Sequence, residues 1–233
     1  MAINARKVKG NAGSGKKYPP VDAGTYPARL VQVIDLGLQP QAPYQGQEKP
    51  PANEIMLTYE LLDEFLPDDE GNEDKTKPRW YSETMSIRNL ESDLAKSTKR
   101  YYALDPDENF RGDWSKLVGA SCMVTLVHKP RQGDPENPYV NVGNVSSMRP
   151  KEAAKAPELV NPPKVFDLDD PDLEVFNSLP TWLQDKIKDN LNFAGSRLEK
   201  VLANQDKKAD KKVDKKAAPE EINEEVEEEE APW

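Results

Sequence analysis

Aromatic and basic side chains stand next to one another at several places in the sequence. The clearest clusters are residues 79–81, 99–102 and 129–139. Rings of this kind stack on the exposed bases of single-stranded nucleic acid, at about 1–3 kcal/mol per base, while cations contact its phosphates. We therefore predict a DNA-binding surface. Its candidate residues are Lys16, Lys17, Arg29, Tyr44, Arg79, Trp80, Tyr81, Arg88, Lys99, Arg100, Lys129, Arg131 and Tyr139.

Each of these aromatic residues also fits a place in the hydrophobic core. Neighbouring positions on a strand point to opposite faces, so Trp80 and Tyr81 cannot both face one groove. One of the two is therefore expected in the core. Tyr101 and Tyr102 lie in an expected helix and fit the core equally well. The prediction depends on the joint pattern of rings and cations rather than on any single residue.

Residues suited to catalysis or metal binding are few. The chain has one histidine and one cysteine. His128 follows a β-rich run, where a surface role is expected, and Cys122 lies within that apolar run, where a small core residue is expected. The acidic stretch 68–74 lacks the spacing of an EF-hand loop. We expect no enzyme, no metal and no cofactor, and an acidic two-metal nuclease site stays open as an alternative.

Residues 10–17, Gly-Asn-Ala-Gly-Ser-Gly-Lys-Lys, match only part of a nucleotide-binding P-loop. Lys17 stands where that motif needs the Ser or Thr that ligates Mg²⁺. The preceding residues are too polar for a buried strand, and Pro19 and Pro20 prevent a helix. Residues 1–20 are therefore interpreted as a flexible basic arm that contacts phosphates through charge.

The end of the sequence is strongly acidic. Residues 220–233 hold eight glutamates and no basic residue, and the last residue is Trp233. Such a segment is expected to be disordered, because its charges repel and little of it can be buried. It can compete with nucleic acid for a basic surface, and a terminal aromatic can anchor in a partner. The candidate partner contacts are Glu227, Glu228, Glu229, Glu230 and Trp233; the alternative is a tail that only aids solubility.

Charge is segregated along the chain. The net charge of −10 over 233 residues becomes −2 once the eight tail glutamates are removed. Residues 206–217, DKKADKKVDKKA, form a basic repeat before the tail. Overall acidity therefore does not argue against a nucleic-acid partner. The single cysteine, the absence of a signal sequence and the absence of a long apolar run predict a cytoplasmic protein with no membrane contact.

The order of expected elements indicates a mainly β fold. β-rich runs are expected as strands, and a run free of Gly and Pro as a helix. Strands are expected at 24–36, 54–62, 79–85, 117–128 and 139–145, with a long loop at 37–53 and a helix at 89–104. Three strands, one helix and two more strands match the order of an OB-fold, a five-stranded barrel. A small mixed α+β sandwich is the structural rival.

The chain divides into five segments by composition. These are the basic arm 1–20, the OB domain 21–150, a linker 151–164, a helical segment 165–204 and the disordered repeat and tail 205–233. In the helical segment, Pro180 suits a first turn, Ser178 suits a cap, and Gly195 marks a division. This segment is too small for its own core, so it must pack on the barrel, self-associate or dock on a partner.

With these features the chain resembles the OB-fold single-stranded-DNA-binding proteins of tailed bacteriophages. The resemblance lies in the element order over 21–145, the basic–aromatic clusters and the acidic tail with its final aromatic. Tails of that family usually end on phenylalanine, where this chain has Trp233. The resemblance implies a protein that coats single-stranded DNA in replication, recombination and repair, in the host cytoplasm if phage-encoded.

The same resemblance implies that the tail recruits a polymerase, helicase or primase and competes with DNA for the groove. Double-stranded DNA binding and a homodimer are left open. A different class of function is an adaptor whose sheet binds protein and whose tail mimics DNA. The basic arm and loop cations favour the DNA-binding hypothesis, because a DNA mimic does not need them.

Overall fold

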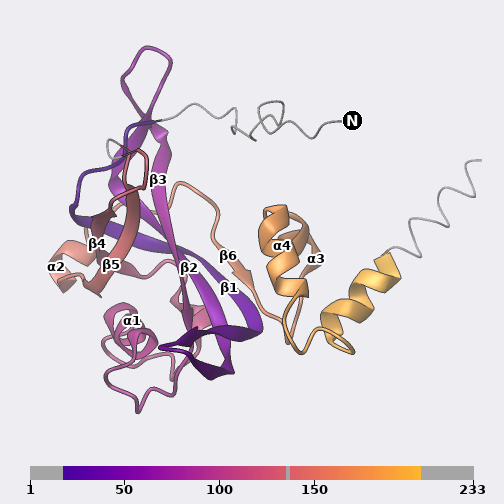
Figure 1. Ribbon diagram of the computed structural model, residues 1–233. Coiled ribbons are helices and arrows are strands. Elements are labelled where there is room, and N and C mark those ends of the chain that lie inside the picture. The colour runs from indigo at the N-terminus through magenta and orange to yellow at the C-terminus, as the bar shows by residue number, and fades with distance from the viewer. Residues whose placement is uncertain (1–17, 135–136, 206–233) are drawn as a thin grey trace, which may run out of the picture.

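The computed structural model describes residues 18–134 and 137–205, which form a mainly β molecule (Figure 1). The strands are β1 (Gly24–Tyr44), β2 (Gln47–Pro67), β3 (Glu73–Ser86), β4 (Ser121–Lys129), β5 (Tyr139–Ser147) and β6 (Lys164–Phe166). The helices are α1 (Lys96–Leu104), the 3-10 helix η2 (Trp114–Leu117), α2 (Pro150–Ala153), α3 (Leu173–Asn177) and α4 (Thr181–Lys188). Residues 197–205 are also helical.

The strands form one open sheet in the order β3-β2-β1-β4-β5, with every neighbouring pair antiparallel. β1 is its centre. One edge of β1 pairs with β2, and the other pairs first with β4, from Gly24 to Arg29, and then in parallel with β6, from Gln32 to Ile34. This arrangement confirms the mainly β class and the order of three strands, a helix and two strands.

Alternating side chains place a first hydrophobic core on the face of the sheet that α1 and η2 cover. Leu57, Tyr59 and Leu61 of β2 are fully buried there, and Tyr101 of α1 packs against the same cluster. Tyr101 also makes an edge-on contact with the ring of Trp114, with centroids 5.3 Å apart. The two-residue period of a strand explains why these residues face one side. α1 thus joins η2 in covering this core.

A second hydrophobic core lies on the other face of the sheet, beneath the C-terminal unit (residues 164–205). Ile34, Leu36 and Met56 of the sheet meet the C-terminal unit there. The buried residues contributed by that unit are Phe166, Phe176, Leu179, Leu183, Ile187 and Leu198. Short helices cannot bury their apolar faces alone, so the C-terminal unit packs on the sheet of its own chain.

The prediction of a long loop at 37–53 is wrong. β1 and β2 continue through this stretch as a two-stranded ribbon, the β1–β2 arm (residues 40–51), which turns at Gln45 and Gly46 with positive φ angles of 50° and 77°. Four prolines lie within it. Proline is tolerated in a ribbon where its missing N–H would face solvent, and it discourages pairing with another sheet. The prolines that suggested a loop therefore belong to an exposed ribbon.

The expected helix at 89–104 begins only at Lys96, and strand four begins at Ser121 rather than at residue 117. Asn89 accepts a hydrogen bond from the backbone N–H of Glu91, a local contact that competes with helix formation. Before strand four, the side chain of Asp113 caps η2. Ser178 does not cap α4, because it ends α3 and Pro180 precedes α4 without a side-chain cap.

Candidate nucleic-acid interface

Two exposed tyrosines carry a cation against one face of the ring. Tyr44, in the β1–β2 arm, is 60% exposed, and the Lys49 Nζ lies 4.7 Å from its ring centroid. Tyr139, at the start of β5, is 53% exposed, and the Arg131 guanidinium carbon lies 4.3 Å from its ring centroid. Each pair combines a ring surface with a positive charge, the two groups that a single strand needs.

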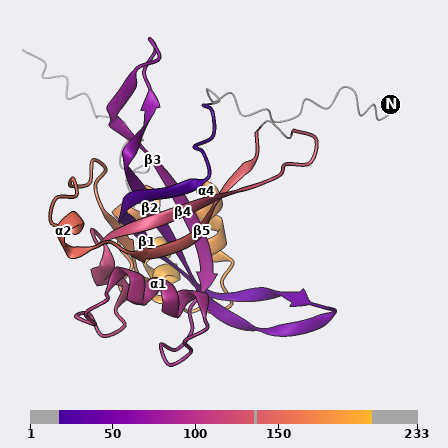
Figure 2. The same cartoon turned by 90° about the vertical axis from the view of Figure 1, so that its left-hand side faces the viewer.

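The two hairpins that carry these pairs extend from the same side of the body. Figure 2 shows the β1–β2 arm and the β4–β5 hairpin both projecting to the right, away from the body of the sheet, at lower and upper right respectively. The arm is held together by β1–β2 pairing as far as Tyr44 and Gln47. The sheet thus presents two tyrosine–cation pairs to one side of the molecule.

Arg131 is half-buried at the β4–β5 hairpin. It lines a small pocket with Tyr18, Pro20, Asn137 and Pro138. Among residues 18–134 and 137–205, no partner bonds to its buried Nε. Lys129, at the base of the same hairpin, is exposed.

The residues of β3 divide between the two faces of the sheet. Trp80 is 46% exposed, whereas Tyr81 is half-buried against the first core, opposite Tyr59. Arg79 donates to the carbonyl oxygens of Phe65, at 3.2 Å, and Pro19, at 2.7 Å. Trp80 is therefore open to a ligand, while Tyr81 serves the core and Arg79 holds neighbouring backbone.

Arg100 is not available to DNA in this structure. Its side chain is 3% exposed, and it forms a two-pronged ion pair with Glu83 at 2.8 and 3.4 Å. It also donates to the Asn144 side chain and to the Gly143 carbonyl oxygen. The sequence predicted Arg100 as a DNA contact, but α1 faces the sheet at this position. Arg100 links α1 to β3 and β5.

Arg29 is also committed inside the molecule. Its guanidinium donates to the carbonyl oxygens of Gly119, at 2.7 Å, Pro157, at 2.7 Å, and Ala156, at 3.1 Å. Directly opposite on β2, the buried Glu60 carboxylate accepts from the backbone N–H groups of residues 160 and 161 and from the Asn161 side chain. These opposite charges hold the predicted linker across the sheet.

The other candidates lie apart from the two tyrosines. Lys99 of α1 is exposed beside Tyr102, Ser146 and Ser147, and Arg88 is exposed after the end of β3. Lys16, Lys17, the tail glutamates Glu227 to Glu230, and Trp233 lie outside the described residues. The structure therefore groups Tyr44, Arg131, Tyr139 and Lys129 on the projecting hairpins.

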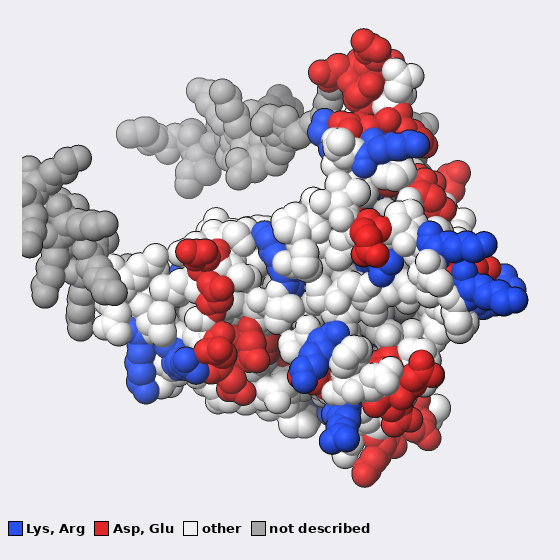
Figure 3. Space-filling view, turned by 180° about the vertical axis from the view of Figure 1, so that it is seen from behind, with Lys and Arg blue, Asp and Glu red and all other residues white. Residues whose placement is uncertain are grey.

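Acidic side chains gather at the tip of the β2–β3 hairpin, at the top of the molecule in Figure 3. Hydrogen bonds from Lys77 and Thr76 lower the pKa of Asp74 to about 2. Over the rest of that face, basic and acidic groups are interspersed. Within the part of the chain that the structure describes, no group of three or more His, Cys, Asp or Glu residues could hold a metal ion.

Cys122 lies in the first hydrophobic core, and His128 contacts the backbone of a neighbouring segment. Cys122 is fully buried, which confirms its prediction as a core residue, and burial raises the pKa of its thiol to about 12. The Nε2 of His128 lies 2.7 Å from the carbonyl oxygen of Val21. Such a contact ties the end of β4 to the start of the sheet.

Sequence reasoning missed Lys49 and Glu60. Lys49 lies on the returning strand of the arm, and the Gln45-Gly46 turn was the signal that could have placed it near Tyr44. Glu60 carries no such signal, because its partners are 100 residues away.

No helix among the described residues is long and apolar enough to cross a membrane. In comparisons with known proteins, no family model, curated protein or solved structure matches the chain.

Proposed function

We propose that the protein binds single-stranded DNA on the side of the sheet from which the β1–β2 arm and the β4–β5 hairpin extend. The observation that carries the proposal is the pair of exposed tyrosines, Tyr44 and Tyr139, each with a cation against its ring. Bases would stack on the rings while Lys49 and Arg131 contact phosphates. Trp80 and Lys129 are further exposed candidates for contact.

The proposal includes the OB-fold barrel expected from sequence. Its support is the element order together with Arg100, which bonds to Glu83 on β3 and to residues 143 and 144 on β5. β3 and β5 are the two ends of the sheet order, so this contact brings the ends together. In OB-folds the loops between strands 1 and 2 and strands 4 and 5 flank the ligand. Tyr44 and Tyr139 occupy those two places.

In this proposal the protein is a non-catalytic one that coats single-stranded DNA in the cytoplasm during replication, recombination and repair. The acidic tail, from its sequence, would compete with DNA and recruit a replication protein through Glu227 to Glu230 and Trp233. The commitment of Arg29 and Arg100 inside the fold removes two cations from the expected surface. The remaining affinity for DNA then depends more on base stacking and on the N-terminal basic arm, residues 1–20.

The test is fluorescence anisotropy with labelled oligo-dT, using the full chain and the variants Tyr44→Ala and Tyr139→Ala. Each loss of a stacking ring should weaken binding about tenfold, as expected for 1–3 kcal/mol per base. Phe110→Ala is the matched control, because Phe110 is a 37% exposed aromatic in the loop between α1 and η2. It should leave affinity unchanged.

Salt dependence gives a second readout. The logarithm of affinity should fall with the logarithm of salt at about 0.7 per phosphate contacted. Binding that is absent at low salt, or that responds equally to the tyrosine variants and the Phe110 control, would refute the proposal. Absence of binding would favour the adaptor function instead.

A further inference from the structure

The β1–β2 arm extends beyond both hydrophobic cores. None of its residues, 40–51, is buried, and Gln41 alone among them is half-buried. An isolated two-stranded ribbon is only marginally stable in water. The direction in which the arm presents Tyr44 and Lys49 is therefore determined by what holds its base.

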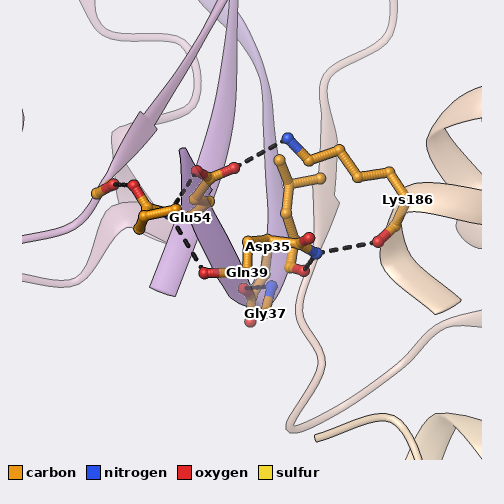
Figure 4. Close-up of polar contacts among 8 residues, drawn as sticks. Asp35, Gly37, Gln39, Glu54 and Lys186 are labelled. Carbon is orange, nitrogen blue, oxygen red and sulfur yellow. Dashed lines mark hydrogen bonds and ion pairs between the residues drawn. The ribbon is translucent and has the colours of Figure 1, made fainter. Parts of the chain in front are cut away.

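A chain of polar contacts holds the base of the arm to α4 and β3. Glu54 of β2 accepts from the Lys186 Nζ of α4 at 2.9 Å and from the Gln41 Nε2 at 2.9 Å (Figure 4). The Gln41 Oε1 in turn accepts from the Ser86 hydroxyl at 3.0 Å. Side chains from both strands of the arm base thus join a helix on one side and the end of β3 on the other.

The backbone of the C-terminal unit meets the same base at consecutive positions. The buried Gln39 donates through its Nε2 to the carbonyl oxygen of Lys186 at 3.0 Å and to that of Leu36 at 2.6 Å. The backbone N–H of Leu191 donates to the carbonyl oxygen of Leu38 at 2.9 Å. α4 and the residues after it therefore contact β1 immediately before it leaves the body as the arm.

These contacts can be separated from the forces that hold the C-terminal unit in place. The unit is anchored by the second hydrophobic core, with Leu183 and Ile187 of α4 both buried. The Lys186–Glu54 ion pair lies at its margin, with side chains 34% and 15% exposed. Loss of one marginal ion pair leaves that core intact, so it affects the arm more than the fold.

We infer that Lys186, Glu54 and Gln41 are positioning residues, a brace through which the C-terminal unit orients the β1–β2 arm for ligand contact. The DNA-binding part of this inference rests on the proposed function. A ribbon already held in its bound direction loses less conformational freedom on binding, which raises affinity without any new contact. The C-terminal unit thereby contributes to binding although Lys186 does not touch the ligand.

The first test measures motion of the arm without DNA. A fluorophore attached at Glu48→Cys reports arm motion through time-resolved anisotropy, and Cys122 does not compete because it is fully buried with a raised thiol pKa. Lys186→Met should increase the nanosecond amplitude of probe motion, and Lys186→Arg should restore it. Arg197→Met is the control, since it removes an exposed ion pair to Asp170 elsewhere in the same unit.

The second test measures oligo-dT affinity in the unlabelled full chain. Lys186→Met should weaken binding about threefold to tenfold, within the range of ordering costs at an interface. It should weaken binding less in a Tyr44→Ala background, because the freer arm then presents only Lys49 to the ligand. A general structural effect would instead act equally in both backgrounds.

The outcomes separate the two proposals. If the wild-type chain does not bind oligo-dT but Lys186→Met frees the arm, the brace stands and the proposed function fails. If the chain binds through Tyr44 and neither arm motion nor affinity responds to Lys186→Met, the brace is overturned. Equal responses from Lys186→Met and Arg197→Met would also overturn it.

Discussion

Replacing Arg100 by methionine tests whether this residue belongs to the fold or to the proposed DNA-binding surface. The guanidinium lies between α1, β3 and β5 and donates four hydrogen bonds, two of them to Glu83. Methionine fills much of the same space but leaves the Glu83 carboxylate without its main partner. We expect a large loss of stability and no specific loss of DNA contact.

The magnitude follows from the surroundings of Glu83. Removing one partner of a buried ion pair costs about 3–5 kcal/mol, because a charge is left uncompensated. Lys96, whose Nζ lies 2.7 Å from the carboxylate, and the Tyr59 hydroxyl, at 3.0 Å, both remain. We therefore expect the low end, about 3 kcal/mol. With a urea dependence of about 2–3 kcal/mol/M, the unfolding midpoint should fall by about 1 M.

Urea unfolding followed by circular dichroism measures this change. Lys99→Met is the matched control, because it removes an exposed cation one position earlier and should change stability by less than about 0.5 kcal/mol. Adding Glu83→Gln to Arg100→Met should recover part of the loss, since the buried carboxylate is then gone. An Arg100→Met variant with wild-type stability and weakened oligo-dT binding would refute this reasoning and assign Arg100 to the proposed DNA-binding surface.

Two further predictions concern the junction between β1 and the C-terminal unit. Gly37→Ala should cost more than about 1–2 kcal/mol of unfolding free energy, because Gly37 has a φ of 72° and a Cβ would lie 2.8 Å from Asn190 and Leu168 atoms. Gly46→Ala, with a φ of 77° and no atom within 4 Å of its Cβ, should show the backbone strain alone, and an equal cost at both sites would contradict the close packing. Burial raises the pKa of Asp35, as do the nearby charges of Asp167 and Asp169, while N–H groups of Gly37 and Leu168 lower it. The stability that its proton contributes is present below the unfolded pKa and is lost as pH rises through the folded pKa. Asp35→Asn should therefore gain stability relative to wild type as pH rises from the unfolded pKa of Asp35 to its folded pKa. A difference in urea midpoint between the two proteins that does not change with pH would argue against this prediction.

Local patterns in the sequence were enough to predict the mainly β class and the order of its elements. Runs rich in β-forming residues identify a strand without knowledge of its partners, which explains why the central part of each long strand was recognised. Cys122 was predicted correctly for the same reason, since its neighbours are apolar. The boundaries were less well predicted. Prolines occur both in loops and in exposed ribbons, and an asparagine can lie within a helix or make a local backbone contact that delays its start.

In the candidate site, local sequence patterns do not distinguish exposed residues from internal ones. Tyr44, Trp80 and Tyr139 were named from sequence, and the structure leaves all three partly exposed. Arg29 and Arg100 were named on the same grounds and are internal, because their acceptors lie up to 129 residues away along the chain. In the sequence, a lysine or arginine beside an aromatic residue looks the same whether its side chain is exposed or internal. Only the folded arrangement of distant segments distinguishes them.

The sequence by itself therefore determined the order of elements along the chain, the segregated charge and the candidate residues of the proposed surface, since these follow from residue type. Tertiary structure decided which cations are free, that the expected loop is an arm, and that α4 holds its base. Those features depend on contacts between segments far apart in the chain, such as β1 and β2 with residues 156–191, and α1 with β3 and β5. Burial and partner geometry arise only when such segments meet, and no local pattern encodes them.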